Sequence, residues 1–175
     1  MPWPLHSDFQ IAELTSMVNN RNKYLDILPG LTEPPASDTP RDHERDIKHD
    51  GPLWPLDDVI GIISGHTEAS PRIRLVTEDA INDHAELVEQ GFCLVTAVCH
   101  LKRTGRYLKS VWCKTSPIKI NGKYRGKGVW IPCDAYTVSC AFENPHNGYS
   151  GTNTYYLKLC MGLNGDAVLF VSAHL

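Results

Sequence analysis

LKLCMGLNGDAVLF, residues 157–170, is the stretch of the sequence that best defines the fold. Its central Asn164-Gly165 is a pair preferred in two-residue type I′ turns, which require positive φ at both positions. Such a turn fixes the register of the flanking strands. The apolar residues then pair on one face, Met161 opposite Val168 and Leu159 opposite Phe170. Because the turn and the apolar pattern agree, these residues are predicted to form an antiparallel hairpin.

The residues before this hairpin also carry strand patterns. Between 135 and 142, bulky apolar side chains alternate with Ala, Thr and Ser, which is the period of two expected of a strand. The runs at 92–101 and 107–114 are predicted to be strands as well, and residues 73–75 a shorter one. The sum is an antiparallel meander sheet of about five or six strands.

One helix is predicted to pack on a face of this sheet, over about 78–90. Thr77 is placed to cap it, and acidic residues occupy its first turn, where the helix dipole favours them. Ile81, Ala85 and Val88 share one face, and Gly91 suits the helix C-terminus. His84 lies near that face and is interpreted as a core histidine. The fold class is therefore α+β.

The N-terminal third differs in composition. A capping box at Ser7 and Gln10 predicts a short helix over 8–20. Residues 29–55 are rich in proline and charge, which favours an extended connector, and the apolar run at 57–65 fits either a helix or a strand. We therefore expect an N-terminal helix and proline-rich acidic arm over 1–65, followed by an α+β core domain over 66–175.

The bulk composition excludes several classes of protein. With 42% hydrophobic and 21% charged residues, the 175-residue chain is able to bury a core. It has no apolar run long enough to cross a membrane and no signal-peptide pattern, so a soluble, cytoplasmic protein is expected. The six cysteines fall in apolar runs without metal-site spacing and are interpreted as core thiols. No cofactor or metal is predicted, because none of the usual binding motifs is present.

The charge is distributed unevenly. Residues 1–90 contain 17 Asp or Glu and 7 Lys or Arg, whereas the segment between Glu89 and Asp134 contains nine Lys or Arg and no acid. Such a split indicates either an anionic partner or pairing between the two halves of the chain.

The segment INGKYRGKGVW, residues 120–130, concentrates this positive charge around a second Asn-Gly pair, at 121–122. A two-residue turn there pairs Ile120 with Lys123 and Ile118 with Arg125. Each pair joins an apolar residue to a cation, so neither face of the hairpin is fit for a core. We expect this hairpin to form a sheet edge or to project from the sheet.

The leading functional hypothesis is a non-enzymatic binding protein whose basic region, about 100–130, engages an anionic partner. Nucleic acid is the first candidate and an acidic protein surface the second, because single-strand binders combine cations with aromatic rings that stack on bases. The predicted nucleic-acid-binding residues are Lys102, Arg103, Arg106, Lys109, Trp112, Lys114, Lys123, Tyr124, Arg125 and Lys127. Two alternatives to a binding surface stay open, namely charge that protects a sheet edge and pairing with the acidic arm.

Two other function classes are also kept. The polar loop at 143–153 is long for a hairpin, and it suggests a small enzyme using Cys140, His146 or Tyr149. A protein-interaction module of the inhibitor or immunity type, with contacts made by the acidic arm, is the third hypothesis. No P-loop, Rossmann glycine motif or nucleophile elbow is present, so no reaction is assigned.

Overall fold

The computed structural model describes residues 22–175, with the side chains of 118–120 excepted. The predicted helix over 8–20 lies outside the described residues. The described chain has the α+β class that was predicted, with helices and strands in mixed order. Its elements are α2 (Tyr24–Ile27), η2 (Asp42–Arg45), β1 (Asp46–Ile47), α3 (Leu56–Ile63), β2 (Ile73–Leu75), α4 (Glu78–Glu89), α5 (Leu94–Thr104), β3 (Gly105–Lys114), β4 (Ile118–Ile120), β5 (Lys123–Arg125), β6 (Trp130–Glu143), β7 (Ser150–Met161) and β8 (Val168–His174).

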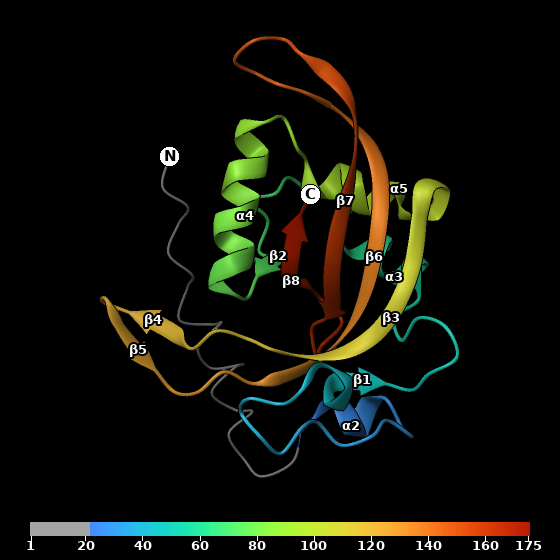
Figure 1. The fold of residues 1–175 in the computed structure, drawn as a ribbon, viewed down its shortest axis with the longest axis vertical. Coiled ribbons are helices and arrows are strands. Elements are labelled where there is room, and N and C mark those ends of the chain that lie inside the picture. Colours follow the sequence, from blue (N-terminus) through green and yellow to red (C-terminus); the bar gives the residue numbers. More distant parts are fainter. Residues whose placement is uncertain (1–21) are drawn as a thin grey trace.

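The main sheet has six strands in the order β1-β3-β6-β7-β8-β2. Strands β3, β6, β7 and β8 are successive antiparallel neighbours, as in a meander, and β1 adds antiparallel to β3. At the other edge β2 pairs with β8 in parallel, which a simple meander does not contain. Figure 1 shows the sheet as a curved layer with α5 behind β7 and β6 and with the β4–β5 hairpin to one side.

The predicted register of the C-terminal hairpin is confirmed, with Met161 opposite Val168 and Leu159 opposite Phe170. The turn itself is longer than predicted. The Gly162 N–H donates to the Ala167 carbonyl at 2.8 Å, which leaves a four-residue loop over 163–166 in which only Gly165 has positive φ. Because the longer loop has the same centre as a two-residue turn, the pairing is unchanged as far as Leu159 and Phe170, and beyond them the register shifts by one residue.

The predicted helix over 78–90 is confirmed as α4. Thr77 caps it, since its Oγ1 accepts from the Ala80 N–H at 3.0 Å. Its buried side chains are Ala80, His84 and Leu87, whereas Ile81 and Val88 are exposed. The apolar face was therefore assigned about one residue away from its true position, and the helix packs against β8 through the face that carries His84.

The prediction of a strand over 92–101 is wrong, because Leu94–Thr104 forms helix α5. Its buried residues Leu94, Ala97, Val98 and Leu101 have the spacing of one helical face. Cys93 at the N-cap makes no side-chain capping bond. The Glu68 carboxylate, 26 residues upstream, accepts the Leu94 N–H instead and caps the helix from another part of the chain.

The acidic arm contributes to the same hydrophobic core as the sheet. The undecided run at 57–65 is mostly helix, α3, and its Val59 and Ile63 are fully buried. Tyr24 and Trp54 are also buried and meet edge to face, with ring centroids 6.0 Å apart. Residues from the segment 24–63 thus pack in one apolar cluster with side chains of β6, β7 and β8.

A buried carboxylate, that of Asp134 on β6, fixes the arm to the sheet. Its Oδ1 accepts from the Leu53 N–H at 3.1 Å and its Oδ2 from the Trp54 N–H at 2.9 Å. The Ser110 hydroxyl donates to Oδ1 at 2.5 Å, and the Trp54 indole N–H donates to the Pro132 carbonyl at 2.8 Å. All of these groups are buried, so this cluster ties residues 53–54 to two strands.

A second carboxylate, that of the half-buried Glu68, joins α4 to α5 and predicts an acid-sensitive contact. Burial raises its pKa, but the His84 ring at 3.0 Å and the Leu94 N–H outweigh burial, so that the pKa of Glu68 lies below its ordinary value of 4.5. The contact therefore stabilises the fold above about pH 4.5 and is lost as the pH falls through the lowered pKa.

We expect the free energy of unfolding of the Glu68→Gln variant at pH 7 to be about 2 kcal/mol lower than that of the wild type, because the variant loses hydrogen bonds to a charged acceptor. Urea unfolding from pH 7 to pH 3 should show this deficit shrinking as the wild-type carboxylate is protonated. Glu86→Gln, on the exposed face of α4, serves as control. A deficit for Glu68→Gln that stays constant with pH would contradict the assignment.

Candidate functional site

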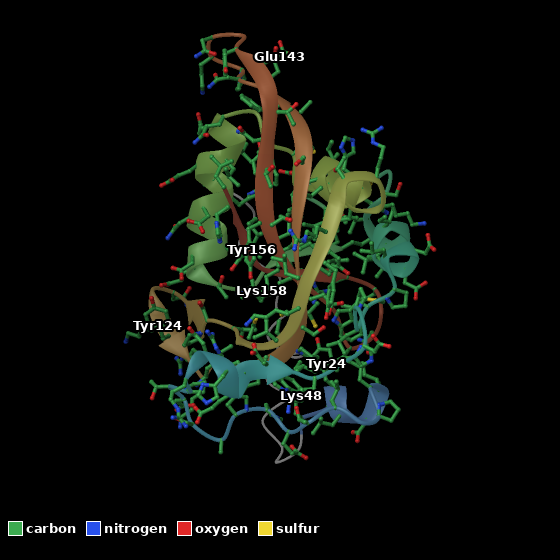
Figure 2. The ribbon with its side chains drawn as sticks, turned by 45° about the vertical axis from the view of Figure 1, so that its right-hand side comes forward. Tyr24, Lys48, Tyr124, Glu143, Tyr156 and Lys158 are labelled. Atoms are coloured by element: carbon green, nitrogen blue, oxygen red, sulfur yellow. The ribbon has the colours of Figure 1, made fainter. Side chains whose placement is uncertain are left out.

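The two faces of the main sheet differ in what covers them. Phe92, between α4 and α5, packs its ring 4.5 Å from that of Tyr155, so the helices lie on the face of β7 that carries Tyr155. Side chains alternate along a strand, so Tyr156 and Lys158 point to the opposite side. We call this second side the open face. Tyr156 and Lys158 lie near the middle of the sheet in Figure 2.

The register places two rows of side chains on the open face, here called the cation rows. One row comprises Arg106, Thr137, Tyr156 and His174, and the next comprises Lys109, Ala135, Lys158 and Ser172. The register of β3 shifts between Tyr107 and Lys109. Without this bulge, Arg106 and Lys109 would point to opposite faces, because they are an odd number of residues apart. The bulge therefore brings both cations to the open face.

The cation rows carry four basic side chains around an aromatic centre. Arg106, Lys109 and His174 are exposed, and Tyr156 and Lys158 are half-buried. The His174 ring stacks on that of Tyr156 with centroids 4.9 Å apart, and the Lys158 Nζ lies 5.5 Å from the Tyr156 centroid. The rows contain no acidic residue. Lys109 pairs with Asp46 at 2.6 Å, whereas Arg106 and Lys158 form no ion pair with another residue of the described 22–175.

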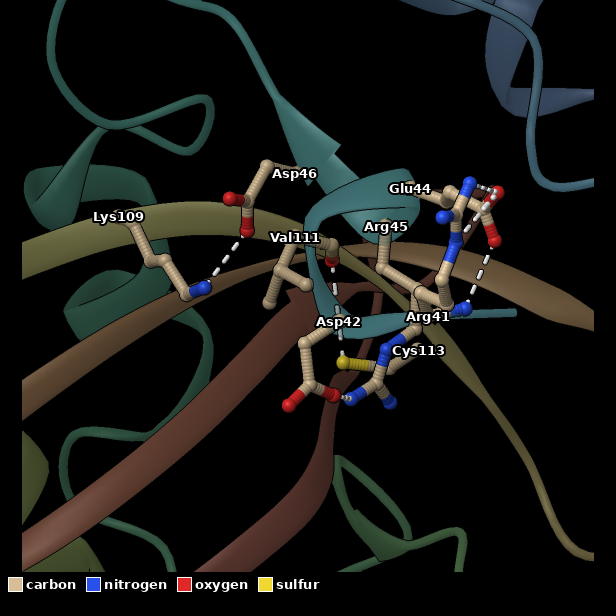
Figure 3. Close-up of polar contacts among 8 residues, drawn as sticks. All are labelled: Arg41, Asp42, Glu44, Arg45, Asp46, Lys109, Val111 and Cys113. Carbon is tan, nitrogen blue, oxygen red and sulfur yellow. Dashed lines mark hydrogen bonds and ion pairs between the residues drawn. The ribbon is translucent and has the colours of Figure 1, made fainter. Parts of the chain in front are cut away.

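Residues 42–47 border the open face next to β3. Figure 3 shows η2 beside β3, with Arg45 close to Cys113 and with Asp46 directed at Lys109. Arg45 pairs with Asp42 at 2.6 Å, and Arg41 pairs with Glu44 at 3.0 Å. The four charged side chains of η2 and its N-cap thus pair with one another. From this segment, Asp46 alone forms an ion pair with the cation rows, through Lys109.

The thiols next to this border are structural. Cys113, Cys133 and Cys160 are buried on neighbouring strands, and all six cysteines are free. The nearby Cys133 thiol and then burial raise the pKa of Cys113, and burial raises the pKa of Cys133. Such thiols are poor nucleophiles. Within 22–175 no group of three or more His, Cys, Asp or Glu is arranged to hold a metal ion.

Three of the predicted basic residues pair with acids of the N-terminal arm. Lys102 pairs with Asp57, Lys109 with Asp46 and Lys114 with Asp38, across sequence separations of 45, 63 and 76 residues. The arm therefore neutralises part of the basic segment, as one of the alternatives expected. Arg103 and Arg106 are exposed and have no such partner among the described acids.

Trp112 has to be removed from the predicted binding residues. Its side chain is 1% exposed, because it lies on the helix-covered side of β3 together with Ser110. Its indole nitrogen is buried without a hydrogen-bond partner among the described groups. A ring in this position packs in the core and is not accessible to a base.

The β4–β5 hairpin has the predicted turn and register. Asn121 and Gly122 both have positive φ, 49° and 77°, and Ile120 pairs with Lys123 and Ile118 with Arg125. The remaining predicted residues of this region, Lys123, Tyr124, Arg125 and Lys127, are exposed. The Tyr124 hydroxyl donates to Glu78 at 2.6 Å, which attaches the hairpin to the start of α4.

The alternative catalytic residues are not assembled into a reactive group. Cys140 is buried, and burial followed by the nearby Cys93 raises its pKa. His146 is exposed and pairs with Glu89 at 2.7 Å, while the exposed Tyr149 ring lies 5.8 Å from that of Phe142. Among the described residues no hydrogen bond joins Cys140 to either of the other two, so the activated thiol of a nucleophile and base pair is missing here.

Tyr156, Lys158 and His174 were not predicted as site residues. They lie outside the acid-free segment, and strand pairing alone brings them next to Arg106 and Lys109. The alternation at 135–142 indicates a small-residue face, and the alternation within β7 places Tyr156 and Lys158 on one side of that strand. The register shift next to Lys158 then decides that His174 lies opposite Tyr156, and the sequence did not indicate this shift.

The chain matches no protein-family model, no curated protein and no solved structure. Across the described part of the chain, none of the helices combines the length and the apolar character needed to cross a membrane.

Proposed function

We propose that this protein binds an anionic polymer, single-stranded nucleic acid in the first place, through the cation rows of the open face. The observation that carries the proposal is the register that aligns Arg106, Tyr156 and His174 beside Lys109 and Lys158, in two rows that contain no acidic residue and in which Asp46 pairs with Lys109 alone. No enzymatic step is assigned.

The chemistry of the cation rows suits a single strand. Cations that follow a phosphate backbone and aromatic rings that stack on bases are the two components of sequence-tolerant single-strand binding. Arg106 is able to grip a phosphate with two N–H donors, and Lys158 supplies a point charge. Strands β3 and β7 are two positions apart, so their cations flank a strip about 10 Å wide. Two small side chains lie between these strands, Thr137, which is half-buried, and Ala135, which is buried.

The test is the affinity for a labelled single-stranded oligonucleotide, measured by fluorescence anisotropy across a salt series. We expect wild-type binding to weaken with salt. The double variant Arg106→Ala/Lys158→Ala should bind about tenfold or more weakly at low salt, with a log–log slope that is smaller by about 1.4, because each phosphate contact contributes about 0.7 for single strands.

The matched control is Lys123→Ala/Arg125→Ala, which removes the same charge from the exposed hairpin. The proposal requires this control to keep more affinity than the open-face variant. Equal losses of affinity in the two variants would indicate a general charge effect and would contradict the proposal. A larger loss in the control would indicate that the hairpin, and not the open face, contacts the oligonucleotide. If the wild-type protein binds an acidic protein surface and no oligonucleotide, the partner is an acidic protein and not a nucleic acid.

A further inference from the structure

A shallow depression of about 420 Å³ lies at the root of the β4–β5 hairpin, separate from the cation rows. It is lined by residues that enter and leave the hairpin and by one residue of the N-terminal arm. These include Asp38, Lys114, Ser116, Lys127 and Gly128. Two lysines and a hydroxyl group therefore converge on one small space.

The root of the hairpin is held by backbone contacts. The Thr115 N–H donates to the Val129 carbonyl at 2.9 Å, and the Val129 N–H donates to the Thr115 Oγ1 at 3.0 Å. A Cβ on Gly128 would meet the Thr115 carbonyl oxygen at 1.9 Å, so only glycine allows this close approach. These contacts fix the backbone on the hairpin side of the depression before any ligand binds, which lowers the entropic cost of binding.

The donors of the depression suit a phosphate group. Lys114 and Lys127 supply two ammonium groups, and lysine is a common binder of phosphate. The Ser116 Oγ accepts the Glu78 N–H at 2.9 Å, which leaves its own proton to donate to an acceptor. The Lys114 Nζ also lies 5.8 Å from the centre of the Trp130 ring, so an indole borders the site.

One anion is already present, the carboxylate of Asp38. It pairs with Lys114, which lies 76 residues further along the chain. The hydrogen bond and charge of Lys114, and then the charge of Lys127, hold the pKa of Asp38 below its ordinary value. Residues 31–41 form no helix or strand, so Asp38 is carried by an irregular segment.

We propose that the depression is a phosphate-binding subsite and that the Asp38 carboxylate, which lines it, pairs with Lys114 in the free protein as an internal anion. A phosphate group carries more charge than a carboxylate and three acceptor oxygens, so it competes with Asp38 for both lysines. The phosphate belongs either to a small molecule or to a nucleic-acid backbone. This inference uses other residues than the cation rows and does not depend on them.

The test compares Asp38→Asn with Asp42→Asn in a tryptophan-fluorescence titration with inorganic phosphate at constant ionic strength. Trp130 is the reporter, and both variants remove one acidic charge from the arm. We expect Asp38→Asn to bind phosphate about three- to fivefold more tightly than Asp42→Asn, the range that an exposed ion pair supports. Adding Lys114→Gln to Asp38→Asn should abolish the gain. Equal affinities of the two single variants would overturn the inference.

A second arm of the experiment identifies the source of the phosphate. The same variants are titrated into a labelled single-stranded oligonucleotide. A gain for both probes supports a subsite that reads a polymer backbone, and a gain for inorganic phosphate alone supports a small phosphorylated ligand. Arg106→Ala/Lys158→Ala should keep its phosphate affinity. If the oligonucleotide affinity of this double variant equals that of the wild type, the proposed function is wrong, while the phosphate subsite is unaffected.

Discussion

Replacing Gly91 by alanine should lower the free energy of unfolding by about 3 kcal/mol, which places it among the more severe single substitutions. For a chain of this size, that loss corresponds to a melting temperature roughly 6–12 °C lower. Urea unfolding followed by circular dichroism, together with a thermal melt, measures both quantities.

Two features of Gly91 cause this loss. Its φ is 92°, a conformation that a Cβ disfavours, and its N–H donates to the Val88 carbonyl while the Phe92 N–H donates to the Leu87 carbonyl. This is the Schellman pattern that ends α4. A Cβ would also lie 1.9 Å from the Glu143 carbonyl oxygen, which is backbone and has no rotamer to change. The substitution therefore displaces the end of β6.

Gly148→Ala separates these two causes. Gly148 also has positive φ, 68°, and lies in the loop between β6 and β7, but a Cβ there meets no atom within 4 Å. It should cost only the backbone strain, about 1 kcal/mol. If Gly91→Ala costs no more than Gly148→Ala, the contact between the α4–α5 turn and Glu143 is not rigid and the argument is wrong.

What the sequence predicted correctly is local in origin. Both Asn-Gly pairs mark hairpin turns, and the register around each is the predicted one. The Thr77 cap and the Gly91 terminus of α4 are likewise set by residues within a few positions. Turn and cap preferences depend on φ and on nearby N–H groups, so they are readable without knowledge of the fold.

The errors have a non-local origin. Residues 92–101 contain β-branched residues and cysteines and resemble a strand, but Glu68 caps them as a helix and the sheet buries one helical face. Strand propensity gives way here to a tertiary contact. Leu94, Ala97, Val98 and Leu101 do have helical spacing, but the run is also apolar on both faces of a strand, so periodicity alone does not decide between the two.

The candidate site was predictable only in part for the same reason. Arg106 and Lys109 stand out by composition, but a bulge in β3 decides that they share a face. Trp112 has the same composition signal and points into the core. Residues of β7 and β8 complete the cation rows through strand pairing, which brings Tyr156 of β7 into one row with Arg106 of β3, 50 positions earlier in the chain, with β6 between them.

The substitution with the largest expected effect is Asp134→Ala, for which we expect a loss of about 4 kcal/mol in the free energy of unfolding. It leaves three buried donors, the N–H groups of Leu53 and Trp54 and the hydroxyl of Ser110, without their acceptor. Each unsatisfied buried donor costs about 1–3 kcal/mol, and the Ser110 hydroxyl is able to recover part by rotating. Asp166→Ala, in the exposed loop before β8, is the control and should change stability by less than about 0.5 kcal/mol.

A double-mutant cycle with Ser110→Ala measures how much of this loss belongs to the hydroxyl. We expect the double variant to be more stable than the sum of the single losses predicts, by about 1 kcal/mol, because it no longer contains the hydroxyl that Asp134→Ala leaves without its acceptor, while the N–H groups of Leu53 and Trp54 lose theirs in both variants. Limited proteolysis near residues 48–52 should also accelerate in Asp134→Ala, since the carboxylate holds the adjacent backbone. Additive losses and unchanged proteolysis would contradict the role of Asp134 as the anchor of the arm.

The pH dependence of Asp134→Asn distinguishes this carboxylate from Glu68. Burial raises the pKa of Asp134 above its ordinary value of 3.8, against the opposing hydrogen bonds from Ser110, Trp54 and Leu53. As the pH falls, the folded state therefore binds a proton before the unfolded state does. The contribution of Asp134 to the free energy of unfolding is largest below pH 3.8, and it declines as the pH rises through the raised pKa. The asparagine variant lacks this gain, so its deficit should be larger at pH 3 than at pH 7, whereas that of Glu68→Gln should shrink. The two carboxylates thus predict opposite slopes over the same pH range, because desolvation outweighs the hydrogen bonds at Asp134, whereas at Glu68 the hydrogen bonds and the charge of His84 together outweigh desolvation.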